Sequence, residues 1–258
     1  MKTTKKSIKA IVTFVAIASV LSINSCQKEN LESPSNAATG DQNTSLLSNS
    51  AKPNANALVY PANCSVYGSS YAAWSAKWWK WAMEYPVAGH PFIDDPSFNV
   101  SNRQSGNVWF LAAPFGTVTR FINIPRNKAL FVGLLNAEAS DLEGLGNNYV
   151  ERRDNAKFNA DHIRNLSVSI DCAPLTNVNC YRFLSPQFSF KAPNPWIFSP
   201  APYGCGVSVA DGYYILIKPL SCGQHKLHYS GDFHFAIAEG DPFDFDAALD
   251  MTYHINVQ

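Results

Sequence analysis

The sequence has no excess of charge of either sign. It contains 20 Lys and Arg and 20 Asp and Glu among 258 residues, and loss of residues 1–25 would remove four lysines and no acidic residue. Proteins that bind nucleic acid concentrate Lys and Arg, because these side chains displace counterions from the phosphates. A balanced to slightly acidic chain therefore excludes DNA and RNA as expected partners.

The sequence also lacks the short motifs of several enzyme classes. It has no G-x-S-x-G nucleophile elbow, no glycine-rich phosphate loop after a strand, no H-E-x-x-H and no C-x-x-C. These absences do not exclude a carbohydrate hydrolase. The two carboxylates of a glycosidase need only lie about 5–10 Å apart in space, so they can come from any two strands.

The N-terminal apolar run, residues 11–21, is too short to span a membrane. It has about half of the roughly 20 residues that a spanning helix needs, and lysines precede it, as in an export signal. With Ile23-Asn24-Ser25-Cys26 it resembles the lipobox of bacterial lipoproteins. The resemblance implies cleavage after residue 25 and acylation of Cys26, and the lipid anchor is expected in the outer membrane, on either of its two faces. The alternative is an ordinary secretory leader cut near the same place.

Residues 26–58 are predicted to be the lipidated cysteine and a disordered tether. They are rich in Asn, Ser, Ala and Pro, and so little apolar surface cannot repay the entropy of ordering the chain. Gln27-Lys28-Glu29 resembles the short export signals of surface lipoproteins. Residues 59–258 are aromatic and β-branched without a second linker or an internal repeat, which predicts a single domain.

The pattern of that domain predicts a mainly β fold, an antiparallel β-sandwich with an aromatic N-terminal helix and a second surface helix. A serine cap and Pro86 bound the aromatic helix at about residues 70–84, and the second helix falls within residues 148–163. Apolar runs and alternation predict strands at residues 108–112, 118–124, 129–135, 166–170, 181–184, 188–191, 213–218, 224–230 and 249–257.

Aromatic side chains of the first helix are the first candidates for a ligand site. Tyr71, Trp74, Trp78 and Trp81 share one face, and Trp79 lies about 100° from Trp78 around the helix, where it could be exposed at the edge of the stripe. If the Trp79 ring is exposed at this edge of the stripe, it would form a platform for sugars. The alternative is burial against a sheet.

Three further residues complete the candidate ligand site: Trp109, Arg120 and His225. Arg120 falls on the apolar side of its strand, where a charge needs a partner unless its stem reaches water. His225 is expected to face the core and to find a hydrogen-bond partner there.

Two clusters suggest metals. Asp241, Asp244 and Asp246 crowd into one turn and could hold calcium, although the turn does not match the twelve-residue calcium loop; no other cofactor is expected. The alternative is a solvated acidic loop. Alternation places three histidines on outward faces of adjoining strands, either as solvated imidazoles or as a zinc site: His228, His234 and His254.

Five cysteines follow Cys26, and in an exported protein they should be oxidised in pairs. Cys172 and Cys180 flank a turn-rich loop and are the first expected pair. Cys205 with Cys222 is the second expected pair, which leaves Cys64 free.

Several motifs spread over residues 64–258 resemble, in order, those of a family of secreted bacterial single-domain proteins. They are YAAWSAKWWKW from residue 71, QSGNVWFL from 104, IPRNKALF from 124, SPQFSF from 185, DGYY from 211, LSCGQHKLH from 220 and DMTYHI from 250. The resemblance implies a secreted single-domain form and carries no catalytic residues.

The resulting hypothesis is a surface-anchored, non-catalytic protein that binds a glycan or another extracellular ligand. One alternative is an extracellular carbohydrate-active hydrolase, with Arg120, His225 and an acidic residue in a pocket roofed by Trp78 or Trp79. Another is a structural or partner-binding lipoprotein whose aromatic side chains are all buried.

Overall fold

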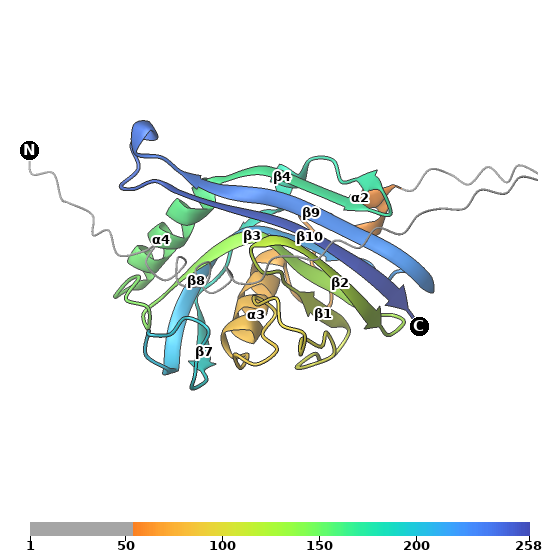
Figure 1. Cartoon of the computed structure of the whole chain (residues 1–258), viewed down its shortest axis with the longest axis horizontal. Coiled ribbons are helices and arrows are strands. Elements are labelled where there is room, and N and C mark those ends of the chain that lie inside the picture. The colour runs from red at the N-terminus through yellow and green to blue at the C-terminus, as the bar shows by residue number, and fades with distance from the viewer. Residues whose placement is uncertain (1–53) are drawn as a thin grey trace, which may run out of the picture.

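The computed structural model describes residues 54–258, which form a β-sandwich of two five-stranded sheets (Figure 1). The strands are β1 (Val108–Leu111), β2 (Gly116–Ile124), β3 (Ala129–Ser140), β4 (Ile163–Ile170), β5 (Ala173–Pro174), β6 (Arg182–Leu184), β7 (Phe188–Ala192), β8 (Gly204–Ile217), β9 (Gly223–Phe235) and β10 (Phe245–Val257). The first sheet has the order β1-β3-β8-β6 with β7 also on β8, and the second has the order β2-β10-β9-β4-β5. The predicted leader, Cys26 and the tether as far as residue 53 lie outside the described residues.

The predicted mainly β sandwich is confirmed, with one difference from a purely antiparallel arrangement. β1 pairs with β3 in parallel, and β2 pairs with β10 in parallel. Parallel neighbours need a crossover connection between them. β2 supplies the first crossover, because the chain leaves β1, runs through the second sheet as β2 and returns to the first sheet as β3.

The aromatic helix is α3, Tyr71–Met83, and it packs against the first sheet. The side chain of Ser70 caps it by accepting a hydrogen bond from Ala73 N at 3.3 Å. Trp78 donates its indole N–H to Leu111 O at 2.9 Å, and Trp79 donates to the Tyr214 hydroxyl at 2.9 Å. Both rings are thus satisfied by the sheet that they cover.

Close contact between α3 and β3 depends on a glycine. A Cβ atom at Gly133 would lie only 2.4 Å from Cζ2 of Trp78, well inside van der Waals contact. β3 also has an irregular register against β8 between Gly133 and Asn136. The missing side chain and the bulge together make room for the indole.

The second predicted helix is α4, Tyr149–Asp161, capped by Asn148. It packs on β3 and β8 and buries Ala156 and Ala160, while Tyr149 stays largely exposed. A third helix, α2 (Ala55–Leu58), falls within the residues predicted to be tether. It is held because the Asn56 side chain accepts a hydrogen bond from Thr176 N at 3.2 Å. No helix in residues 54–258 combines the length and the apolar character needed to cross a bilayer.

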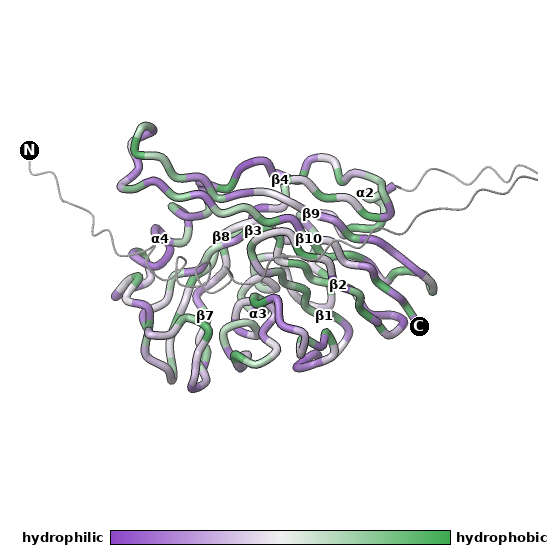
Figure 2. The backbone as a smooth tube through the Cα atoms, viewed as in Figure 1, coloured by the Kyte–Doolittle hydropathy of each residue, from purple (hydrophilic) through white to green (hydrophobic). Residues whose placement is uncertain are grey.

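The two sheets differ in how their faces are covered. β3 is buried along almost its whole length, as expected of a strand covered on both sides. β9 and β10 instead alternate between buried and more accessible residues, which Figure 2 shows as alternating hydrophobic and hydrophilic colour. The second sheet therefore packs one face on the core and presents the other to solvent.

The expected disulfides are not formed, because all five cysteines of residues 54–258 are free. Cys172 lies at the tip of a two-residue hairpin between β4 and β5, with a φ of 64° and an exposed side chain. Cys205 lies at the start of the long strand β8, and Cys222 lies beyond its other end, immediately before β9. The 13 residues of β8 from Cys205 onward span roughly 40 Å, far more than the 4.4–6.8 Å between Cα atoms in a disulfide.

Candidate binding surface

The tryptophans predicted to bind ligand belong to the core. Trp78 and Trp79 are each 2% exposed, and Trp109 is 8% exposed. The interpretation of Trp79 as an exposed sugar platform is wrong, and the alternative, burial of the ring against a sheet, is confirmed. Phe92, from the segment after the helix, packs edge-to-face on Trp79 with ring centroids 5.7 Å apart and covers it.

Trp78 and Trp79 do line a cavity, which has a volume of about 50 Å³. Asn136, Phe198 and Leu249 are among its other walls. Pockets that hold small organic ligands usually measure about 300–1,000 Å³, so this cavity is too small for a sugar ring. Neither Trp109 nor Arg120 nor His225 lines it, and the predicted ligand site is therefore not formed as one cleft.

Arg120 is 7% exposed, which corrects the alternative that its stem carries the charge to water. Its Nη1 donates to Pro91 O and Ala112 O, both at 3.1 Å, and its Nη2 donates to Ile93 O at 2.8 Å. The guanidinium also lies 4.0 Å over the Phe98 ring. The partners that a buried charge requires are thus backbone carbonyls, and Arg120 fastens the segment 86–107 to the second sheet.

His225 faces inward at the start of β9 and is half-buried, in agreement with the alternation. Its Nδ1 lies 2.7 Å from Asp171 Oδ2, and its Nε2 lies 3.2 Å from the Ser221 hydroxyl and 3.0 Å from the Ser221 carbonyl oxygen. Asp171 also accepts from Lys226 N at 2.8 Å. The imidazole therefore joins the β4–β5 and β8–β9 turns at one end of the sandwich.

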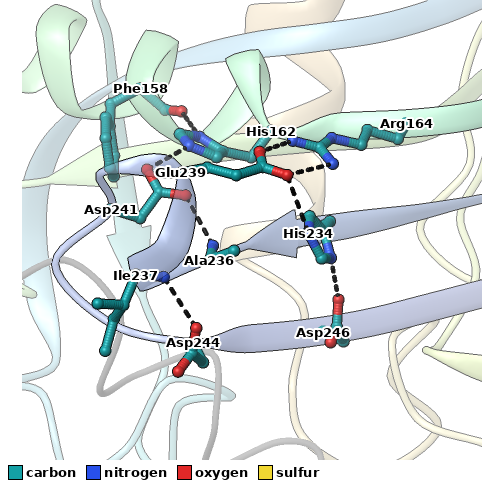
Figure 3. A network of polar contacts seen from close by, with 10 residues as sticks. All are labelled: Phe158, His162, Arg164, His234, Ala236, Ile237, Glu239, Asp241, Asp244 and Asp246. Atoms are coloured by element: carbon teal, nitrogen blue, oxygen red, sulfur yellow. Dashed lines mark hydrogen bonds and ion pairs between the residues drawn. The ribbon is translucent and has the colours of Figure 1, made fainter.

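Each acidic residue proposed for calcium has its own partner (Figure 3). Asp241 accepts from Ala236 N at 2.8 Å and contacts His162 Nε2 at 2.8 Å. Asp244 accepts from Ile237 N at 2.8 Å, and Asp246 lies 2.5 Å from His234 Nδ1. The loop of residues 236–246 is thus closed by separate hydrogen bonds and ion pairs.

Within residues 54–258, no group of three or more His, Cys, Asp or Glu is placed to hold a metal ion. His228 and His234 point outward as predicted, and each contacts an aspartate of β10, Asp250 at 3.1 Å and Asp246 at 2.5 Å. Calcium and zinc stay predictions that these contacts do not support.

The solvent-facing side of the second sheet, here called the free face, gathers polar side chains around one aromatic ring. The register of β2, β10 and β9 places them in three rows: Thr119, Thr252 and His228; Phe121, His254 and Lys226; Asn123, Asn256 and Gln224. Every residue of the free face alternates with a residue turned toward the interior, so the rows follow from the pleat.

Phe121 is the most exposed large apolar side chain of the described residues, at 79%. Its ring stacks on the imidazole of His254, with centroids 4.7 Å apart and planes 9° from parallel. A single exposed apolar residue is common on protein surfaces. This ring differs because its neighbour holds it in a defined orientation in the middle row.

The third row forms a ladder of carboxamides. Asn256 donates to Asn123 Oδ1 at 2.9 Å, and Gln224 donates to Asn256 Oδ1 at 2.9 Å. A carboxamide has two N–H donors and an oxygen that accepts twice, so the ladder uses only part of its hydrogen-bonding capacity. An ordered aromatic ring thus lies one row from ordered donors and acceptors.

The sequence held a signal for this surface. The prediction placed Val118, Arg120 and Ile122 on the inner side of β2, and the same alternation leaves Phe121 as an apolar residue on a side otherwise made of Thr and Asn. Its stacking on His254 depends on the parallel pairing of β2 with β10, which a local pattern does not predict.

Comparisons of the chain with models of protein families, with curated proteins and with solved structures find no match. The resemblance to a family of secreted bacterial proteins therefore stays a prediction, and the function is argued from the free face.

Proposed function

We propose that this protein is an exported lipoprotein, anchored through acylated Cys26 at the outer surface of the cell, whose domain binds glycans without catalysis. The observation that supports the proposal best is the ordered Phe121–His254 stack beside the carboxamide ladder. A sugar ring has an apolar C–H face and a rim of hydroxyl groups. The aromatic ring complements the first, and carboxamides complement the second.

The geometry favours an open surface as the binding site. The cavity beside Trp78 and Trp79 has room for only small groups at about 50 Å³, whereas the free face extends over three neighbouring strands. An open surface of this extent accepts a polymer along its length, so the ligand class is an extended glycan chain.

The test is affinity electrophoresis of the unlipidated chain, residues 27–258, in gels that contain soluble polysaccharides of different composition. We expect retardation by at least one of them. Phe121→Ala should lose this retardation, and Asn256→Ala should weaken it. Tyr203→Ala is the matched control, because Tyr203 is another exposed aromatic residue, at 61%, away from the free face.

Retardation that Phe121→Ala leaves unchanged would remove the free face as the site. Absence of retardation by every polysaccharide would favour the alternative of a structural or partner-binding lipoprotein, in which Phe121 contacts another protein.

A hydrolase is the second candidate, and one observation favours it. Ser221, His225 and Asp171 form a hydroxyl–imidazole–carboxylate series with distances of 3.2 and 2.7 Å, the arrangement that activates a serine for acyl transfer. The Ser221 carbonyl lies 3.0 Å from the same Nε2, and a proton on Nε2 would be donated there, which leaves the hydroxyl without a base. Ester hydrolysis that Ser221→Ala abolishes would establish this activity, and equal rates in the two proteins would exclude it.

A further inference from the structure

Two glutamates meet at the end of β3. Glu138 is 3% exposed, and Glu143 lies half-buried in the turn that follows the strand. The serines that the two glutamates contact, Ser208 on β8 and Ser140 on β3, are direct partners in the strand register, which brings the two carboxyl groups together. Ser208 of β8 donates to Glu138 Oε2 at 2.5 Å, and Ser140 donates to Glu143 Oε2 at 2.7 Å. The hydroxyl groups therefore fix one oxygen of each carboxyl group.

Two ionised carboxylates placed side by side would repel, and a hydrogen bond forms between them only when one holds a proton, because an ionised carboxylate only accepts. Burial raises the pKa of Glu138 well above its usual range, and the neighbouring Glu143 and Asp141 raise it further. Burial also raises the pKa of Glu143. Two carboxyl groups in contact share a proton for the same reason in other proteins.

The groups that face the pair from the elements around it supply no neutralising cation. Ser208 and Tyr214 lie on β8, and Asp141 lies in the turn itself. On α4 the three cations are engaged elsewhere: Arg152 donates to Gly146 O and to Gln187, Arg153 is paired with Asp154, and Lys157 lies 4.0 Å from Asp211. Among the described residues, no Lys, Arg or His side chain is ion-paired with either glutamate.

The turn that carries Glu143 is held to β8 close to the pair. Asp141 N donates to Val207 O at 3.2 Å, and Val207 N donates to Asp141 Oδ1 at 2.9 Å. Leu145 N donates to Ser140 O at 2.9 Å and closes the turn on itself. The contact between Glu138 and Glu143 is the link that changes sign with pH, from hydrogen bond to repulsion of two charges.

We propose that Glu138 and Glu143 form a protonation-dependent latch, in which one shared proton keeps the turn of residues 141–147 against β8 and its release loosens the turn. The latch is separate from the free face and does not depend on the proposed function. The pKa values of both groups are higher in the folded than in the unfolded chain. The latch therefore adds its full contribution to the free energy of unfolding below the ordinary glutamate pKa of 4.5. That contribution is lost as the pH rises through the higher pKa of the pair in the folded chain.

Infrared spectroscopy of residues 27–258 in D₂O tests the proton directly. At pH 7 we expect a carboxylic-acid C=O band equal to one group per molecule in the wild-type chain and its loss in Glu138→Gln. Asp154→Asn, an exposed change on α4, is the control and should keep the band. A folded wild-type chain without that band at pH 7 would overturn the proposal.

Amide hydrogen exchange at Leu145 tests the opening. Base catalysis raises the intrinsic exchange rate of every amide with pH. In the wild type, the exchange rate at Leu145 should rise at least about tenfold more than this as the pH passes the pKa of the glutamate pair in the folded chain. Glu138→Gln supplies a permanent N–H donor to the Glu143 carboxylate and should remove that extra acceleration. Equal acceleration in both proteins would refute the latch even if the band were present.

Discussion

Replacement of Arg120 by methionine separates a structural role from a binding role most clearly. Methionine keeps an apolar stem of similar length and removes the guanidinium, which donates to three carbonyl groups. Ala112 O would keep a partner, because the Tyr253 hydroxyl also donates to it at 2.5 Å. Pro91 O and Ile93 O would lose their only described donor.

The magnitude follows from these two acceptors. A buried acceptor left without a partner costs roughly 1–3 kcal/mol, so the free energy of unfolding should fall by about 3 kcal/mol. A loss of this size is a large part of the roughly 5–15 kcal/mol that holds a domain together. Arg120→Lys keeps the charge but has fewer N–H donors, so its free energy of unfolding should fall by about half as much.

Urea unfolding of both variants at constant pH measures this effect, with the slope of free energy against urea checked for equality. Arg126→Met, at an exposed position on the β2–β3 turn, is the control and should change stability by about 0.5 kcal/mol or less. A loss below about 1 kcal/mol in Arg120→Met would refute the carbonyl account. Weakened polysaccharide binding by folded Arg120→Lys would restore Arg120 to the ligand site.

Three further outcomes follow from the structure and the sequence. Gly133→Ala should lower the free energy of unfolding by about 1–3 kcal/mol, because the new methyl group meets Trp78; unchanged urea unfolding would mean that the indole moves freely. His90 is buried, donates to Ala82 O and accepts from Phe92 N, and its pKa is lowered by burial to about 4. Unfolded histidine takes up its proton below about pH 6.5 and the folded one only near pH 4, so stability should fall by about 3 kcal/mol over that interval as the pH drops. The free energy of unfolding of His90→Gln should depend less on pH over this interval. Parallel curves for the variant and the wild type would show that His90 does not cause the pH dependence. Cys26→Ser should move the protein from the membrane fraction to the soluble exported fraction, and mass spectrometry of the wild type should find acyl chains on Cys26.

The sequence predicted well the features that depend on near neighbours. Ser70 and the spacing of Tyr71, Trp74 and Trp78 predicted α3 to within about a residue at each end. The alternation along residues 224–230 and 249–257 correctly assigned the sides of β9 and β10. These periodicities are local properties of the chain and need no knowledge of the fold.

The features that were wrong or missed depend on contacts between distant segments. Trp79 is buried because Phe92, from a loop without a regular pattern, covers it. Arg120 is satisfied by carbonyl groups, which every residue has and which therefore leave no signature in the sequence. The expected pair of Cys205 and Cys222 is separated by the length of β8, which the prediction began at residue 213 and the structure begins at Gly204.

The Glu138–Glu143 contact was missed for the same reason. Nothing in the local sequence marks Glu138 and Glu143 as partners, and only the return of the turn over the end of β3 brings their carboxyl groups together. The free face was half predicted, since the outward histidines were assigned but the exposed Phe121 was not singled out.

The central claim is that the free face binds an extended glycan, and isothermal titration calorimetry tests it most directly. The titrant is an oligosaccharide cut from a polysaccharide that retards the wild-type chain. Loss of a ring stack worth about 0.5–1.5 kcal/mol should weaken binding by Phe121→Ala about two- to tenfold, while Tyr203→Ala should bind as the wild type does. Equal affinities for Phe121→Ala and the wild type, with both proteins folded, would contradict the account.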